Sequence, residues 1–132
     1  MKYYLDTSIL LDYYENRGSN GRQALALILK ILKDNSLLIF SDLHIKELKN
    51  LHYSSVEINS VINIFKPNVV RAHINKNQIA EARRMKEQIN IPLSDILHSI
   101  ISRDNESILV YRDHHFEKLK YLITIKKPEE LL

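Results

Sequence analysis

Cysteine is absent from this chain of 132 residues, which also holds only two glycines and three prolines. Without cysteine there can be no disulfide, no thiolate zinc site and no thiol nucleophile, and a reducing cytoplasm is the expected compartment. The two glycines, Gly18 and Gly21, lie in a predicted turn between helices, which excludes a glycine-rich phosphate loop. No apolar run approaches the roughly 18 residues of a membrane span, so we expect no membrane association.

The composition is that of a folded globular protein, with 45% hydrophobic and 27% charged residues. The length predicts a single domain over residues 1–132. The net charge is +3, and basic residues cluster at 83–86 and 126–127. Such clusters suit polyanions, including nucleic acid, but a solvated surface explains them equally well.

Short apolar runs alternate with amphipathic stretches along the chain. The runs predict strands at 2–5, 36–40, 68–74, 107–111 and 121–125. The amphipathic stretches predict helices at 7–17, 20–32, 41–51, 54–65, 76–89 and 93–104, with a short turn or helix at 112–119. Several strands are continuously apolar, which is typical of parallel sheets covered by helices. The expected fold is a three-layer α/β/α sandwich with a central, mainly parallel sheet.

Two sequences predict helix starts by capping boxes, Asn20 with Gln23 and Ser54 with Glu57. Gly18 is expected to end the first helix. The stretch 24–32 is apolar almost all round, which predicts a helix that is deeply buried or shared with a partner chain.

Four acids lie in places that favour a shared site. Asp6 directly follows the first strand, and Asp113 follows the 107–111 strand after one intervening residue. In parallel α/β sheets the functional crevice lies beyond the carboxyl ends of the strands. Glu47 is aligned with apolar neighbours on its helix, and Asp95 lies in the first turn of the 93–104 helix.

Each acid also has an ordinary interpretation. Asp6 could cap the helix that follows it. Asp95 could be a first-turn acid stabilised by the helix dipole. Asp113 could start a turn, and Glu47 could lie on the surface. Taken together, four acids at one edge favour a site over four separate coincidences.

Carboxylates that converge repel one another, and a hard divalent cation relieves that repulsion. Mg²⁺ and Mn²⁺ prefer oxygen ligands and retain some water. Such an ion lowers the pKa of bound water and neutralises a phosphodiester as it is cleaved. The acids therefore predict metal-assisted phosphoryl chemistry.

Histidine offers a competing set of ligands, with six residues but no HExxH zinc signature. His114 and His115 are adjacent, and adjacent side chains rarely share a metal ion. His98 lies one helical turn from Asp95 and is the best candidate to orient a ligand or phosphate.

With these residues in view, the chain resembles PIN-domain proteins, most of all the small single-domain VapC-type toxin ribonucleases. The resemblance rests on "YYLDTSILLDYY", "SDLHIKEL", "PLSDILHSIIS", "LVYRDHHF" and "PEELL", in that order over essentially the whole chain. It implies an acidic quartet of Asp6, Glu47, Asp95 and Asp113 that holds one or two Mg²⁺ or Mn²⁺ ions for RNA hydrolysis.

The resemblance extends beyond the quartet. Thr7 and Ser8 match the small hydroxyl residues that support the first acid. The family also implies a homodimer and a small antitoxin partner that blocks the acidic pocket. The sequence departs from the family pattern at Tyr111, His44 and His115.

The leading hypothesis is a metal-dependent endoribonuclease in which Arg112 holds the RNA backbone. PIN domains that process other RNA without being toxins, or that bind RNA or a partner without cutting, are the alternatives. A signalling receiver domain is a further one, since the "KKP" at 126–128 is similar to its lysine–proline pair. A receiver needs two acids after the first strand, however, and here Asp6 stands alone.

Overall fold

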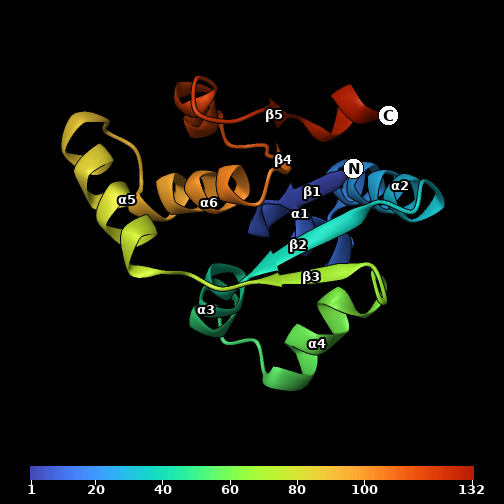
Figure 1. Ribbon diagram of the computed structural model, residues 1–132. Helices are drawn as coiled ribbons and strands as arrows, with labels where there is room; N and C mark the ends of the chain where they lie inside the picture. Colours follow the sequence, from blue (N-terminus) through green and yellow to red (C-terminus); the bar gives the residue numbers. More distant parts are fainter.

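The computed structural model describes all 132 residues and has a five-stranded, all-parallel sheet at its centre (Figure 1). The strands lie in the order β3-β2-β1-β4-β5. Their bounds are Lys2–Leu5 for β1, Leu37–Ser41 for β2, Val69–Ala72 for β3, Ile108–Val110 for β4 and Ile125–Lys126 for β5. The predicted parallel α/β architecture is confirmed.

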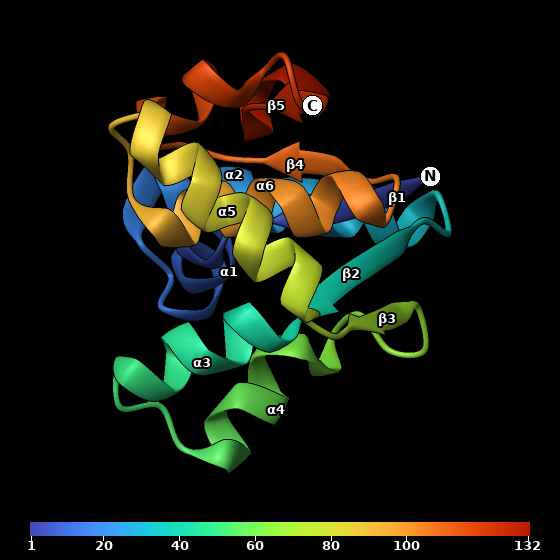
Figure 2. The same ribbon diagram turned by 60° about the vertical axis from the view of Figure 1, so that its left-hand side comes forward.

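Six α-helices and two 3₁₀ segments connect and cover the strands. They are α1 (Thr7–Tyr14), α2 (Gly18–Lys33), α3 (Asp42–Asn50), α4 (Ser55–Asn63), α5 (Lys76–Gln88), α6 (Leu93–Asp104), η1 (His114–Leu119) and η2 (Pro128–Leu131). Figure 2 shows α5 and α6 running across one face of the sheet, and α3 with α4 beyond the β2–β3 side. None of the helices is long and apolar enough to cross a membrane.

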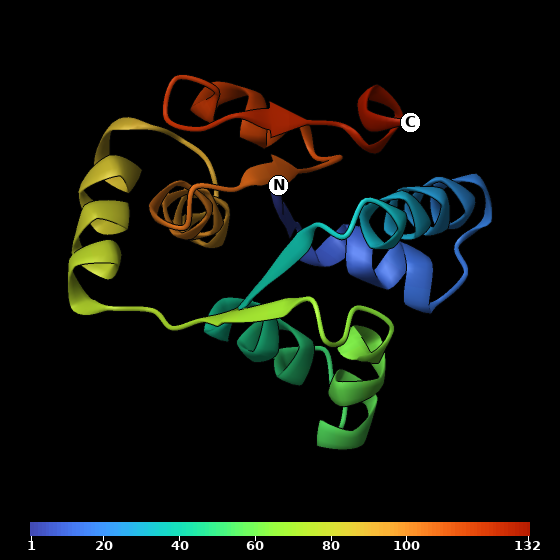
Figure 3. The same cartoon turned by 45° about the vertical axis from the view of Figure 1, so that its right-hand side comes forward.

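Side chains of the central strand alternate between two hydrophobic cores, one on each face of the sheet. Tyr3 and Leu5 belong to the core formed with α1, α2 and α4. Tyr4 points to the other face and joins the core formed with α5, α6 and η1. Figure 3 shows the two layers, with α5 and α6 in yellow and orange on one side and α1 and α2 in blue on the other. The alternation follows from the period of two in a β-strand.

The carboxyl ends of β1 and β4 lie side by side, so the strands before Asp6 and Asp113 are neighbours. Leu5 is in register with Val110. The backbone N–H of Asp6 donates to the carbonyl of Val110 over 2.9 Å, so the pairing extends one residue past the strand. This bond fixes where the first acid leaves the sheet.

Two predicted boundaries are wrong. Helix α2 begins at Gly18, which has a left-handed φ of +56°, so Gly18 starts this helix and Asn20 is not its cap. The 121–125 stretch is not a strand before Ile125, because the N–H of Leu122 donates to Leu119 and closes a turn after η1. The capping box of Ser54 and Glu57 is confirmed.

Helix α2 is not buried all round. Its inward side chains are Ala24, Leu27, Ile28 and Ile31. Leu25 and Leu29, one turn apart, are 40% and 53% exposed. The apolar run therefore supplies one core-facing side and one apolar patch at the surface of this chain.

Candidate functional site

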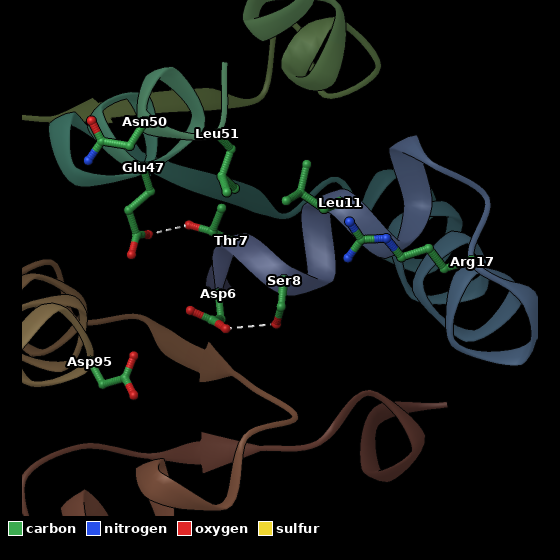
Figure 4. A pocket seen from close by; sticks show the side chains of 9 residues that line it. All are labelled: Asp6, Thr7, Ser8, Leu11, Arg17, Glu47, Asn50, Leu51 and Asp95. Atoms are coloured by element: carbon green, nitrogen blue, oxygen red, sulfur yellow. Dashed lines mark hydrogen bonds between the residues drawn. The ribbon is translucent and has the colours of Figure 1, made fainter. Parts of the chain in front are cut away.

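A pocket of about 460 Å³ opens at the carboxyl edge of the sheet (Figure 4). It brings together three of the four predicted acids, carried by three different segments. The residues that line it are Asp6, Thr7, Ser8, Leu11, Arg17, Glu47, Asn50, Leu51 and Asp95. Asp113 is not among them.

Asp6 is placed by the end of β1 and the start of α1. It occupies the N-cap position of α1, yet its side chain makes no capping hydrogen bond. Its Oδ2 instead accepts from the Ser8 hydroxyl over 2.8 Å. Burial raises the pKa of Asp6, and the nearby Glu47 carboxylate adds to the rise, while His98 and Ser8 oppose it. Asp6 is therefore a buried carboxylate that faces the pocket, which its capping interpretation does not explain.

Glu47 is not a surface residue of α3. Its Oε1 accepts from the Thr7 hydroxyl over 2.6 Å and from Nε2 of His98 over 2.6 Å. Burial acts to raise the pKa of Glu47, but these two hydrogen bonds and the charge of His98 outweigh it and hold the pKa below its ordinary value. Both hydroxyl groups were expected to support Asp6. Ser8 does so, whereas Thr7 donates its hydrogen bond to Glu47.

His98 was predicted to orient a ligand or a phosphate, and it is fully buried, so it reaches the pocket only through its hydrogen bond to Glu47. Its Nδ1 bonds to the Tyr4 hydroxyl at 2.5 Å, and that hydroxyl also bonds to the Ser41 hydroxyl at 2.8 Å. Burial opposes protonation, but the hydrogen bond and charge of Glu47 raise the pKa of His98 overall. The residue acts on Glu47 from inside the core.

His44, one of the departures from the family pattern, has a structural role at the start of α3. The Ser41 N–H donates to its Nδ1 over 2.9 Å, so its other ring nitrogen carries the proton and donates to the carbonyl of Leu5 over 2.7 Å. Burial lowers the pKa of His44 to about 3, which keeps the ring neutral. This residue joins the beginning of α3 to the end of β1 and so sets the distance between Glu47 and Asp6.

Asp95 lies in the first turn of α6 and lines the pocket, a position compatible with both the dipole interpretation and the site interpretation. Burial raises its pKa to about 6, and the charges of Asp6 and Asp113 add to the rise while His98 opposes it. Asp95 and Asp6 therefore repel each other across the pocket, as converging carboxylates are expected to do.

Asp113 lies outside the pocket lining, at its Asp95 side. Its side chain is 47% exposed, and it caps η1 by accepting from the N–H of His115, as its turn interpretation predicted. Nδ1 of His115 lies 3.1 Å from Asp113 and 3.4 Å from Asp95 and makes no hydrogen bond. His115 thus lies between Asp113 and Asp95, and Asp113 does not enter the pocket in this arrangement.

Tyr111, another departure from the family pattern, is buried in the core against Phe116.

Arg112 does not offer a free guanidinium for RNA. It forms an ion pair with the buried Asp12 at 3.2 Å and donates to Gln23 over 2.9 Å. The pocket lining includes a different cation, Arg17, whose side chain is 48% exposed and lies 3.6 Å from the other carboxylate oxygen of Asp12. No periodic pattern in the sequence indicates Arg17, because this residue lies in the connection between α1 and α2.

No family model and no curated protein matches this sequence. Solved structures do match the fold. VapBC2 from Rickettsia felis, bound to a DNA fragment from its promoter, has a TM-score of 0.71 at 18% identity over 96% of this chain and 98% of that chain. VapBC-1 from nontypeable Haemophilus influenzae has a TM-score of 0.71 at 16% identity over 98% and 99%. FitAcB from Neisseria gonorrhoeae has a TM-score of 0.64 at 15% identity over 98% and 99%.

The chain has a VapBC-like fold. At 15–18% identity the likeness is one of fold and does not extend by itself to activity. In each comparison the likeness covers nearly the whole of this chain and of the matched chain. The pocket therefore lies within the fold that the two chains share.

The residues of the pocket fit a hard divalent cation. Asp6, Glu47 and Asp95 offer oxygen donors, and burial together with neighbouring carboxylates raises the pKa values of Asp6 and Asp95. The carboxylate oxygens of Asp6, Glu47 and Asp95 do not all lie within 4.8 Å of one another. The three acidic or histidine side chains whose potential ligand atoms lie within 4.8 Å of one another are Asp113, His114 and His115, outside the pocket. An ion shared by the pocket carboxylates therefore requires them to move closer.

Proposed function

We propose that the protein is a Mg²⁺- or Mn²⁺-dependent endoribonuclease of the PIN-domain, VapC-like type. The observation that carries the proposal is the convergence of Asp6, Glu47 and Asp95, from three segments, on one pocket at the carboxyl edge of a parallel sheet. The VapBC-like fold and the PIN-type motifs support it.

In this proposal each residue has a defined task. Asp6 and Asp95 hold the cation, and Asp113 joins them if the η1 segment moves inward. The bound cation supplies an acidified water and neutralises the charge that develops on the phosphate. Glu47 ligates the cation directly or through a bound water, and it orients the attacking water. Arg17, at the rim, binds a backbone phosphate of the RNA.

The proposal also includes two protein partners, an antitoxin and a second copy of this chain. We propose a small antitoxin protein that covers the acidic pocket, since VapBC names recur among the structural neighbours. We also propose a homodimer, for which the exposed Leu25 and Leu29 of α2 offer an apolar surface. Size-exclusion chromatography with light scattering measures the second proposal, and a monomer at micromolar concentration contradicts it.

The decisive experiment replaces Asp6 by asparagine and measures Mn²⁺-dependent cleavage of a mixed RNA substrate. We expect a loss of at least 100-fold with the fold unchanged, because the variant keeps the size of the side chain and removes a charged ligand. The exposed Asp34→Asn is the matched control and should keep full activity. Full activity in Asp6→Asn contradicts the proposal. If the wild type binds Mn²⁺ and RNA but never cleaves, the chain is a binding module.

A further inference from the structure

Three buried residues form a chain of hydrogen bonds that ends on Glu47. It runs from Ser41 at the end of β2, through the Tyr4 hydroxyl in β1, to His98 in α6, and then to the carboxylate on α3. Tyr4, Ser41 and His98 are each 0% exposed. Such a chain is fixed in place by the core that surrounds it.

The aromatic packing around Tyr4 restricts the rings further. The Tyr4 ring lies 4.6 Å from the His44 ring and meets the His98 ring edge to face at 5.4 Å, measured between ring centroids. The His98 ring therefore cannot turn to another partner without disturbing its neighbours. Its Nε2 remains directed at Glu47.

Both hydrogen bonds to Glu47 fall on the same oxygen. Thr7 and His98 each reach Oε1 at 2.6 Å, and the side chain is 27% exposed. A carboxylate oxygen accepts about two hydrogen bonds in good geometry, so Oε1 has no further capacity. The other oxygen, Oε2, has no protein donor, and Figure 4 shows it directed toward the space bordered by Asp6 and Asp95.

We propose that His98, anchored by Tyr4, is a positioning residue that commits Glu47 to act in the pocket through Oε2 alone. This inference rests on the proposed function, because it describes how one acid of that site serves the cation or its water. Glu47 then contributes Oε2 to the pocket, while its Oε1 stays hydrogen-bonded to Thr7 and His98. The chemistry recognised at Oε2 is a divalent cation or a water bound to it.

The test uses Tyr4→Phe, which removes the anchor and leaves His98 and the pocket residues in place. Tyr3→Phe is the matched control, since Tyr3 is the adjacent residue in β1 and its hydroxyl contacts Met1 on the other face. Two quantities are measured on the whole protein: the affinity for Mn²⁺ by calorimetry, and the ring N–H signal of His98 by ¹H–¹⁵N NMR without metal.

Outer hydrogen-bond partners of metal sites typically change affinity or activity by about 10- to 100-fold. We expect Tyr4→Phe to weaken Mn²⁺ binding by about 3- to 10-fold and to broaden or shift the His98 signal, while Tyr3→Phe changes neither. His98→Leu should weaken binding by at least 10-fold, and His98→Gln, whose amide can still donate to Glu47, should recover part of it. In a cleavage assay kcat should fall and KM should not change.

Folded Tyr4→Phe and His98→Leu proteins with wild-type Mn²⁺ affinity would overturn the inference, as would a His98 signal that Tyr4→Phe leaves unchanged. The calorimetric and NMR measurements need no RNA. If the wild type cleaves no RNA and yet these two measurements follow the expected pattern, the proposed function fails and the positioning role of His98 stands.

Discussion

The carboxyl group of Asp95 lies where ionisation is costly. Its pKa of about 6 lies above the ordinary 3.8 because the side chain is buried and faces two other carboxylates. An acid whose pKa is raised by folding destabilises the folded state above that pKa, where the folded protein must carry the charge. The cost disappears below the ordinary pKa, where both states are protonated.

Asp95→Asn should therefore stabilise the metal-free protein at pH 8. The two pKa values set an upper bound of about 3 kcal/mol, and partial solvent access reduces the expected gain to about 1–2 kcal/mol. The gain should vanish at about pH 3, below the ordinary pKa of the carboxyl group. Urea unfolding in the presence of a chelator measures it at both pH values. The exposed Asp34→Asn should change the free energy of unfolding by less than about 0.5 kcal/mol, and a variant less stable than wild type at pH 8 would refute this account.

At the scale of the elements, α5 is joined to α6 by one ion pair of good geometry. Both terminal nitrogens of Arg103 donate to the two carboxylate oxygens of Glu81, each over 2.7 Å. The hydrogen bonds from Arg103 lower the pKa of Glu81. The two side chains are 31% and 30% exposed, so solvent screening reduces the value of the pair.

Glu81→Gln should lower the free energy of unfolding by about 0.5–1 kcal/mol at pH 7. Because folding lowers the pKa of Glu81, this stability is present above the ordinary value of 4.5 and is lost as the pH falls through the lowered value. Wild type and variant should therefore converge in acid. Glu87→Gln, at an exposed position of the same helix, provides the comparison. Equal differences at pH 7 and in acid would show that the pair does not act through charge.

The elements that the sequence predicted well are those specified by neighbouring residues. The capping box at Ser54 depends on residues three apart, and the apolar runs of β1, β2 and β4 are buried on both faces. The wrong boundary at 121–125 follows from a local turn after η1, whereas the wrong start of α2 depends on a contact between elements. At Gly21 an added Cβ would lie 2.7 Å from the carbonyl oxygen of Asp12 in α1, so packing against α1 helps to define where α2 runs.

The same distinction between local patterns and long-range contacts applies to the residues of the candidate site. Asp6, Glu47 and Asp95 could be picked out because Asp6 directly follows β1, Glu47 lies on the helix that follows β2, and Asp95 lies in the first turn of α6. The link between Tyr4 and His98 joins residues 94 positions apart, and no local pattern indicates it. Arg112, predicted to hold RNA, is paired with the buried Asp12, which lies 100 positions away and which no local pattern indicates.

For the molecule as a whole, the pocket concentrates negative charge that the protein does not fully neutralise. Burial raises the pKa of both Asp6 and Asp95. A divalent cation that binds the folded protein and not the unfolded chain relieves this repulsion and shifts the folding equilibrium by mass action. At 100 times its dissociation constant it stabilises the fold by about 2.7 kcal/mol.

Mn²⁺ should therefore raise the melting temperature at pH 7.5 by several degrees, since each 1 kcal/mol corresponds to about 2–8 °C in domains near this size. The rise should be smaller at pH 5, because a proton on Asp95, whose pKa is about 6, competes with the cation. Thermal unfolding followed by circular dichroism measures it, with NaCl at equal ionic strength as the control for screening. The double variant Asp6→Asn/Asp95→Asn should show no rise. If Mn²⁺ raised the melting temperature of wild type and double variant equally, the ion would bind elsewhere, and the exposed group of Asp113, His114 and His115 would be the next place to look.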